Sequence, residues 1–410
     1  MRRAVVIAVL LGGSFTLPAM LQAQTRAAAT ASAAAPKAAA KAVAPAKAGA
    51  AIRVSRNSWG QPDLGGFWAN ATITKEVRDR SLGARAIYTP EEVAREEGIV
   101  QTEIKVGNQV IDPNKGRPSV GGDPLPAGIR PELAVASGPS GGYERGWLDT
   151  GSTVMRVHGE ARTSILTTPD GQYPARKGQA AGGRGGAAGG GAGRGGGGGG
   201  AGRGGGRGGG AAYIDTPQGR VSTVPLVGGL DNPEQRTISD RCILSFGRNG
   251  GPPMLANGYY NNNYNIVQGK DSVAIMTEMV HDVRIVRLNG KHRTDGVRPY
   301  FGDSIGHYEG DTLVVETTNI PQLQAYAGSW ENLTVTEKFT RVNATHLLYQ
   351  FTIHDPTLWD ADWGGEYEFY SLPPGMRVEE YACHEGNYAL DSILAGARAE
   401  DAAAAKTAVR

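Results

Sequence analysis

Residues 303–318 read DSIGHYEGDTLVVETT, and this stretch decides the fold class of the chain. Two short segments, 304–309 and 312–318, flank Gly310-Asp311, a pair of residues that favours a tight turn. Within the second segment, Leu313 and Val315 are two residues apart and therefore share one face of a strand. The stretch therefore predicts two adjacent β-strands joined by a short turn.

The same pattern of strand, turn and strand continues on both sides of this unit. Upstream, segments 272–277 and 283–288 precede Asn289-Gly290, a strong hairpin signal. Downstream, further segments flank turn residues: 338–342 and 347–354 around Asn343-Ala344, then 366–370 and 376–382 around Pro373-Pro374-Gly375. Such regular spacing predicts an all-β domain that folds as an antiparallel β-barrel or sandwich.

Helix signals are few. Thr89-Pro90-Glu91-Glu92 is typical of a helix start, with Thr89 as the cap and proline in the first turn. An alanine-rich stretch from about residue 389 predicts a helix at the C-terminus.

The first residues have the order of a secretory signal peptide. Arg2 and Arg3 precede an apolar run, Pro18 interrupts it, and Ala23 offers a small residue before a cleavage point. The apolar run is shorter than the roughly 20 residues that span a bilayer, so no membrane span is expected after cleavage. Residues 1–23 are therefore predicted to be removed on export to the periplasm or beyond.

Low-complexity segments set the remaining boundaries. Residues 24–58 are rich in Ala, Lys and Pro and predict a disordered tether, because they offer little to bury. Residues 176–212 are nearly all glycine with interspersed arginines, and we expect a disordered insertion in the domain. The β-domain is thus expected in two parts, 59–175 and 213–395, followed by a helical tail, 396–410.

The distribution of charge argues against a nucleic-acid partner. The chain has 42 basic and 40 acidic residues, but residues 1–50 and 171–212 hold 12 of the basic residues and no acid. The remainder has 30 basic (42 − 12) against 40 acidic residues, a net charge of −10 that repels a polyanion.

Two cysteines, Cys242 and Cys383, are the whole thiol content of the chain. In an oxidising compartment, an even pair far apart in sequence predicts a disulfide. The alternative is a pair of buried free thiols.

Several blocks resemble a family of exported bacterial β-rich proteins. Residues 63–68 (DLGGFW) are similar to a DLxGxW opening, and residues 302–315 resemble a GDSxGxWEGDTLVV block, with Tyr308 at the tryptophan position. Residues 162–171 look like an RTSLIxDPPDGR element, and residues 380–388 match an EYACHEGNY block. The opening is also similar to that of lipocalin-like barrels. The resemblance implies export and a β-rich fold, and it implies no particular activity.

Two polar groups are candidates for catalysis. His384 and Glu385 follow the last predicted strand, in a cluster that ends at Asn387. His307 and Glu309 are two residues apart on one strand, which suits an acid–base pair. For both groups, hydrogen bonds that hold turns and loops together are the alternative role.

An aromatic and acidic cluster is the candidate for ligand binding. Tryptophans Trp359 and Trp363 alternate with the carboxylates Asp360 and Asp362, a combination that can stack on a ligand and bond its hydroxyls. Tyr260 and Asn387 belong to two further aromatic and polar runs. Packing of both tryptophans in the core is the alternative.

Three functions remain open at this point. The chain could bind a small apolar or aromatic molecule or a glycan, act as a His- and carboxylate-dependent hydrolase with or without a metal, or serve as a structural envelope protein. The sequence has no HExxH, nucleophile elbow, phosphate-binding loop or dinucleotide fingerprint, so the cofactor is unknown and no metal site is predicted. The oligomeric state is equally undetermined. We expect the His307 and His384 groups to meet near one rim of the domain if they form a single site.

The mature protein is predicted to begin near Gln24 with Cys242 and Cys383 linked. Mass spectrometry of exported, unreduced protein should therefore show an N-terminal peptide that starts there and a cross-linked pair of peptides. Two thiols open to alkylation in the native protein would contradict the link.

Overall fold

The computed structural model describes residues 54–107, 149–177, 213–216, 219–222, 232–233, 236, 238–239, 241–245, 248–256, 261–386 and 388–408. The predicted signal peptide, residues 24–53 of the predicted tether, residues 178–212 of the predicted insertion, Tyr260 and Asn387 lie outside these ranges. Residues 54–58, Arg176 and Lys177 lie inside them.

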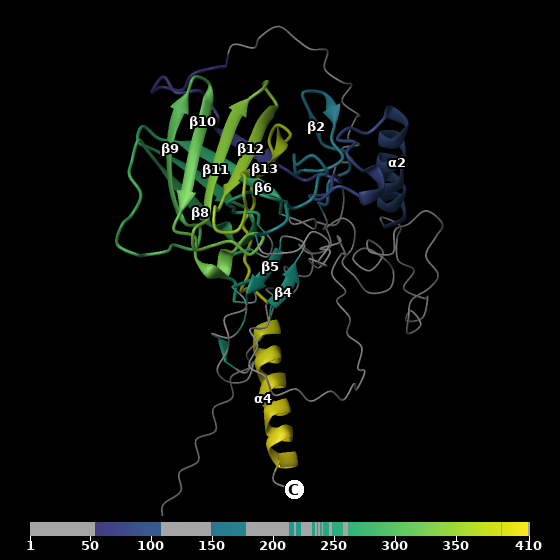
Figure 1. Cartoon of the computed structure of the whole chain (residues 1–410), viewed down its shortest axis with the longest axis vertical. Helices are drawn as coiled ribbons and strands as arrows, with labels where there is room; N and C mark the ends of the chain where they lie inside the picture. Colours follow the sequence, from purple (N-terminus) through teal and green to yellow (C-terminus); the bar gives the residue numbers. More distant parts are fainter. Residues whose placement is uncertain are drawn as a thin grey trace, which may run out of the picture. The chain divides into compact units, whose positions relative to one another are not determined.

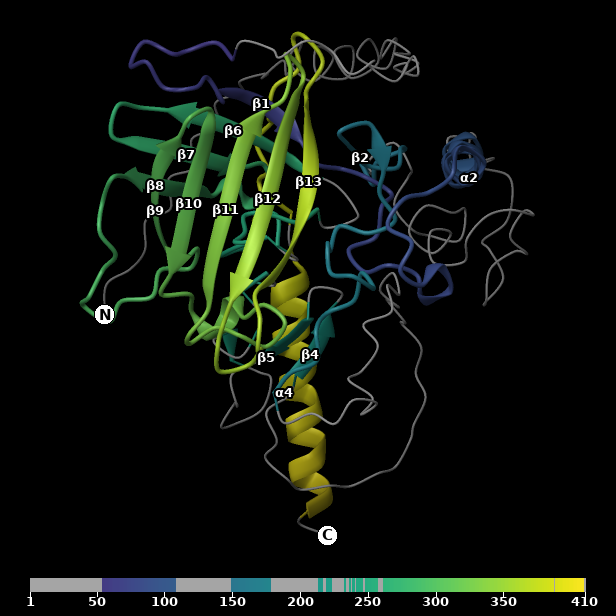
Figure 2. The same ribbon diagram turned by 45° about the horizontal axis from the view of Figure 1, so that its top comes forward.

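Nine strands form a closed β-barrel, which confirms the predicted fold class (Figure 1). Around the barrel the strands follow the order β1-β13-β12-β11-β10-β9-β8-β7-β6, and β6 closes the ring on β1. Neighbouring strands β9 to β13 lie side by side in chain order (Figure 2). The bounds of the nine strands are β1 Gly66–Ala69, β6 Asn263–Gln268, β7 Ser272–Thr277, β8 Val283–Leu288, β9 Asp303–Glu309, β10 Thr312–Thr318, β11 Thr334–Arg341, β12 His346–His354 and β13 Trp363–Ser371.

An odd number of strands forces one parallel pair into the barrel. Directions that alternate around a ring of nine cannot close, and here β8 and β9 run parallel, with Val286 beside Ser304. The hairpin predicted at Asn289-Gly290 is therefore wrong, because the chain after β8 crosses back along the barrel before it enters β9. Asp303 anchors this crossover, since its buried carboxylate accepts bonds from Arg287, His292 and the backbone N–H of Arg293.

The strand predicted at 376–382 is absent. The outer edge of β13 is already paired with β1, where Trp68 lies opposite Ser371. Because a closed barrel has no free edge, the chain after Pro373-Pro374-Gly375 finds no strand to pair with and continues without regular structure.

The remaining elements are short, apart from two helices. Helix α2 begins at Pro90 as predicted, and Thr89 and Glu92 form a reciprocal cap through bonds of 2.9 and 3.3 Å. The predicted C-terminal helix is α4. Bounds are α2 Pro90–Gly107, α4 Ala389–Ala408, β2 Arg156–Val157, β3 Glu160–Ala161, β4 Tyr213–Thr216, β5 Gly219–Ser222, and the 3-10 turns η1 Arg80–Leu82, η4 Met279–His281 and η5 Gln322–Gln324. Among the described residues, no helix is long and apolar enough to cross a membrane.

One end of the barrel, which we call the hairpin end, carries the β6–β7, β9–β10 and β11–β12 turns. The N-terminal segment closes this end: Arg56 pairs with Asp311, and Gln61 donates to the carbonyl of Lys270 at 3.0 Å. Deeper in, the guanidinium of Arg341 lies 4.9 Å from the centre of the Trp68 ring and donates to the carbonyls of Asp63 and Gly65. These contacts hold β1 in the gap between β6 and β13.

The opposite end, which we call the plug end, carries the β7–β8 turn and the β10–β11 and β12–β13 connections. The segment Arg248–Ala256, which we call the plug loop, enters the barrel here. Residues 248–255 are all buried, and the N–H of Met254 donates to the hydroxyl of Tyr349 at 2.7 Å. The barrel is thus filled by its own chain rather than left as an open tube.

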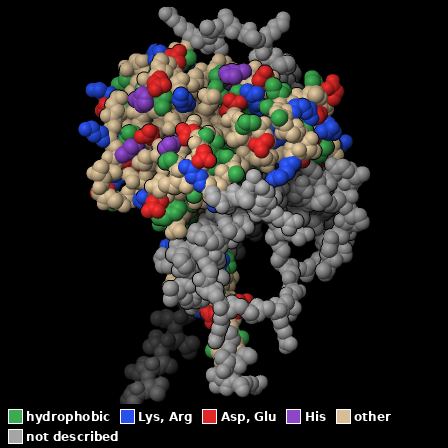
Figure 3. Space-filling view, in the orientation of Figure 1, with side chains coloured by type: hydrophobic (Ala, Val, Ile, Leu, Met, Phe, Trp, Pro, Cys, Tyr) green, Lys and Arg blue, Asp and Glu red, His purple; other side chains and the backbone are tan. Residues whose placement is uncertain are grey.

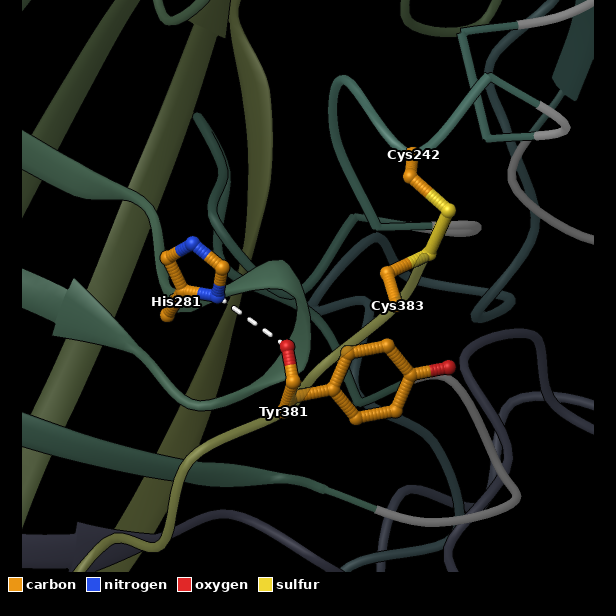
Figure 4. Close-up of a disulfide and its surroundings, with 4 residues drawn as sticks. All are labelled: Cys242, His281, Tyr381 and Cys383. Carbon is orange, nitrogen blue, oxygen red and sulfur yellow. Dashed lines mark hydrogen bonds between the residues drawn. A yellow bond between two sulfur atoms is a disulfide. The ribbon is translucent and has the colours of Figure 1, made fainter. Parts of the chain in front are cut away.

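Cys242 and Cys383 lie at disulfide distance, which confirms their predicted pairing (Figure 4). Their sulfur atoms are 1.99 Å apart, and the link joins positions 141 residues apart in the chain. Next to the link, the ring of His281 bonds the carbonyl of Tyr381 at 3.0 Å. The segment after β13 is therefore held by the disulfide to the segment around Cys242 and by His281 to the β7–β8 turn.

Replacement of Arg341 by alanine should lower the free energy of unfolding by about 3 kcal/mol, because it removes three charge-assisted hydrogen bonds to the carbonyls of Asp63, Gly65 and Ala344 and a cation–π contact. Urea denaturation of the two proteins measures this difference. Lys338→Ala is the matched control, since Lys338 is exposed on the same strand, and a change below about 0.5 kcal/mol is expected for it. Equal effects of the two substitutions would contradict the proposed role of Arg341 in closure.

Candidate functional site

His307 and Glu309 lie on the outer surface of β9. Their side chains are more than half exposed, and Nε2 of His307 is 3.1 Å from Oε1 of Glu309. They contact each other as the spacing predicts, but they face solvent beside the β9–β10 turn.

His384 and Glu385 also lie at the surface, in a turn that follows Cys383. The chain just before them is bound at the plug end, since the N–H of Glu379 donates to Glu278 beside η4 and Tyr381 contacts His281. His307 and Glu309 lie at the hairpin end instead. Strand β9 alone spans roughly 20 Å at about 3.3 Å per residue. The expected meeting of these two groups is therefore wrong, because β9 runs parallel to β8 and carries its last residues away from the β7–β8 turn.

None of the seven histidines is buried, and all of them lie in the described part of the chain. Figure 3 shows histidine side chains at the surface of one face, among mixed charges. His292 and His346 are half-buried and the other five are exposed. Histidine chemistry thus has no place in the barrel interior.

The tryptophan cluster is divided between the inside and the outside of the barrel. Trp359 and Trp363 are only 4% and 6% exposed, and their rings meet edge to face at 5.2 Å. Asp360 faces solvent beside Lys177, and Asp362 bonds His354 at 2.7 Å on the outer surface. The tryptophans and these carboxylates therefore do not line one pocket.

Trp363 instead leads to a carboxylate that the sequence did not indicate. Its ring stacks on Tyr326 at 5.6 Å and meets the edge of Tyr173 at 5.5 Å. Both tyrosine hydroxyls donate to Oε1 of Glu76, that of Tyr326 at 2.7 Å. We call the group Glu76, Tyr173, Tyr326, Trp363 and Arg248 the Glu76 site.

Two segments from the first half of the chain place Glu76 and Tyr173. The carbonyl of Glu76 accepts the N–H of Leu166 at 3.0 Å, so residues 75–76 run beside 165–166 against the barrel wall. The chain then turns at Gly171, whose φ is +66° and where a Cβ would lie 2.5 Å from that of Arg78. Only glycine fits this close approach, and the turn brings Tyr173 back over Glu76.

The plug loop contributes Arg248 to the site. Its guanidinium carbon lies 4.8 Å from the centre of the Tyr326 ring, and Nη1 donates to the carbonyl of Gln324 at 3.0 Å. Nη2 donates to the carbonyl of Pro252. Within the described chain no ion pair joins Arg248 directly to Glu76.

Burial controls the protonation of these groups. It raises the pKa of Glu76, while the two tyrosine hydroxyls and the charge of Arg248 act in the opposite direction. Burial also raises the pKa of Tyr173 and Tyr326 well above the usual value, with the negative charge of Glu76 adding to the effect. Both phenols therefore stay protonated and serve as donors at neutral pH.

A second buried charge pair lies deeper in the barrel and differs from the Glu76 site. Nη2 of Arg284 is 2.9 Å from Oε1 of Glu337, which also accepts the hydroxyl of Tyr349 at 2.8 Å. Side-chain exposure is 2% for Arg284 and 0% for Glu337. This pair is bidentate and closed from solvent, as expected of a group that holds strands β8, β11 and β12 together.

The carboxylate of Glu76 is less completely paired than that of Glu337, although Nε of Arg284 is also buried without a partner. Nε1 of Trp363 and Nε of Arg248 are buried without a hydrogen-bond partner, and Oε2 of Glu76 accepts no hydrogen bond from the described residues. Glu76 and Tyr173 are only half-buried, so the site reaches the surface. The site thus has two donors and one carboxylate oxygen that no described residue pairs, and these are the atoms with which a ligand would have to bond.

The sequence alone did not indicate most residues of the Glu76 site. Glu76, Tyr173 and Tyr326 lie in three distant segments without a shared motif, and only the fold brings them together. For Arg248 a signal existed, because Pro252-Pro253 and Met254 indicate an ordered loop next to it. Among the described residues, no group of three or more His, Cys, Asp or Glu side chains has the arrangement of a metal centre.

No protein-family model matches the chain, and the search of characterised proteins finds no matching sequence. The resemblance to exported β-rich proteins therefore stays a prediction.

Glu368 lies on the outer face of β13, where the effect of partial burial on a carboxyl pKa can be tested. It lies opposite Leu348, and desolvation raises its pKa from 4.5 to about 7. The folded protein thus holds this proton more tightly than the unfolded chain, so stability is lost as the pH rises from about 4.5 through 7.

The substitution Glu368→Gln should remove that loss. We expect the melting temperature of the variant to exceed that of the parent by a few degrees above pH 8, with the gap closing below pH 4. Thermal melts across this range measure it, with Glu309→Gln at an exposed position as the control. A gap that does not change with pH would contradict the assignment.

Proposed function

We propose that this chain is an exported protein that binds a small aromatic molecule at the Glu76 site. The observation that carries the proposal is a half-buried carboxylate held by two tyrosine hydroxyls beside an indole N–H that has no partner. Aromatic faces with a few convergent polar groups are typical of small-molecule sites.

The contrast with the Arg284–Glu337 pair supports a ligand over a purely structural role. Each arginine has a buried Nε without a partner, but Glu337 accepts three bonds on both of its oxygens, while Glu76 accepts two from the described chain and both on Oε1. An unpaired buried donor costs roughly 1–3 kcal/mol. A bound molecule that pairs these atoms would recover that cost.

An aromatic ligand is favoured over a glycan. Glycan binding was expected from tryptophans next to Asp360 and Asp362, but those carboxylates face away from the Trp363 ring. The hydrolase hypothesis has no comparable support, because no described histidine bonds Glu76 or Glu337, and His292 bonds the buried Asp303 in the β8–β9 crossover instead. A structural envelope protein is the alternative if no molecule binds.

Export to the periplasm or beyond rests on the predicted signal peptide and agrees with the cysteine pair. Membership of the exported β-rich family is proposed on the same sequence blocks.

Isothermal titration calorimetry with naphthalenemethanol tests the binding proposal. This probe offers an aromatic face and one hydroxyl that can both donate and accept. We expect saturable binding, and about tenfold weaker binding by Trp363→Phe, since loss of one hydrogen bond costs about 1.4 kcal/mol.

Trp59→Phe is the matched control, because Trp59 lies in the N-terminal segment at the hairpin end. It should bind the probe as the parent does. Equal losses in the two variants would place the binding elsewhere, and absence of binding by the parent would favour the structural alternative.

A further inference from the structure

The Glu76 site contains one negative and one positive charge that are not in contact. Arg248 directs its Nη atoms at the backbone carbonyls of Gln324, Ala325 and Pro252 rather than at Glu76. Its charge nevertheless reaches Glu76, whose acidity it increases. The charges of Glu76 and Arg248 sum to zero. Because the two groups are not in contact, each charge can still attract or repel a charged ligand.

A cationic ligand would find the binding position for a cation already filled by Arg248. The π-face of Tyr326, where an organic cation would bind beside Glu76, already holds the guanidinium of Arg248 at 4.8 Å. A second cation would be repelled at this distance in a site with little water. Glu76 is also satisfied in part, since Oε1 accepts both tyrosine hydroxyls.

An anionic ligand would meet the opposite difficulty. To reach the unpaired N–H of Trp363 it must lie next to the two tyrosines that bind Glu76, and therefore next to a carboxylate. Three of the five N–H groups of Arg248 already donate to backbone carbonyls, so an anion could pair with at most its Nε and the second N–H of Nη2. The desolvation of a charged ligand would thus go uncompensated in either case.

A neutral ligand is repelled neither by Arg248 nor by Glu76. It can bond both to the acceptor oxygen of Glu76 and to the donor N–H groups. A hydroxyl or amide can donate to Oε2 of Glu76 and accept from Nε1 of Trp363, while an attached ring packs on the aromatic side chains. We infer that the Glu76 site selects neutral aromatic alcohols, phenols or amides over cationic and anionic molecules of the same shape. This inference rests on the proposed function and specifies the chemical class of its ligand.

Three probes with one ring system test the inference on the mature full-length chain at neutral pH. They are naphthalenemethanol, which is neutral, naphthalenemethylammonium, which is cationic, and naphthoate, which is anionic. Calorimetry should give the tightest binding for the alcohol, with both charged probes weaker by at least tenfold. A charged probe that binds as tightly as the alcohol would overturn the inference while leaving the proposed site intact. If none of the three binds, the proposed function fails and the inference fails with it.

Glu76→Gln tests the source of the selectivity. The substitution keeps an oxygen for the tyrosine hydroxyls and leaves Arg248 as the one charge of the site. Naphthoate should then gain at least tenfold relative to naphthalenemethanol. Glu76→Asp, which retains the charge, is the matched variant and should keep the parent order of affinities. An unchanged order in Glu76→Gln would overturn the inference, because selectivity would not then arise from the balance of the two charges.

Discussion

The stacking of Arg341 on Trp68 is the contact on which the closed barrel depends. Strand β1 has four residues and lies almost 200 positions before β6, yet it must fill the gap between β6 and β13. So short a strand contributes few ladder bonds on either side. Arg341 adds a cation–π contact and two bonds to backbone carbonyls just before β1, and Trp68 Nε1 donates back to the carbonyl of Leu64 at 3.1 Å. A distant segment is thereby fixed as the ninth strand.

Closure by a ninth strand has two consequences for the rest of the molecule. It requires one parallel pair, and the long crossover between β8 and β9 satisfies this requirement. It also places the N-terminal segment at the hairpin end, while the plug loop and the Glu76 site lie at the plug end. The two surface histidine groups are also separated, since His307 lies near the hairpin end of β9, whereas the chain after β13 returns to the plug end before it reaches His384.

The interior shows how similar residues can serve different purposes. Arg284 and Glu337 form a direct pair with the further bond from Tyr349, and both carboxylate oxygens of Glu337 are bonded, although Nε of Arg284 is buried without a partner. Arg248 and Glu76 keep their charges apart because the guanidinium is bound by the plug loop and the β10–β11 connection. The first arrangement stabilises the barrel, whereas the second leaves two buried N–H groups without a partner, next to a half-buried carboxylate of which Oε2 accepts no bond from the described residues.

The sequence by itself determined the all-β class, most strand positions, the start of α2, the C-terminal helix and the pairing of Cys242 with Cys383. These features depend on local alternation, on capping residues and on the count of cysteines, all of which can be read along the chain. Only the tertiary structure decided the parallel β8–β9 pair, the loss of the strand predicted at 376–382 and the separation of Trp363 from Asp360 and Asp362. It alone assembled Glu76, Tyr173, Tyr326 and Arg248, because ring closure and the plug loop bring together segments up to 250 residues apart, and no local pattern records which distant segments will meet.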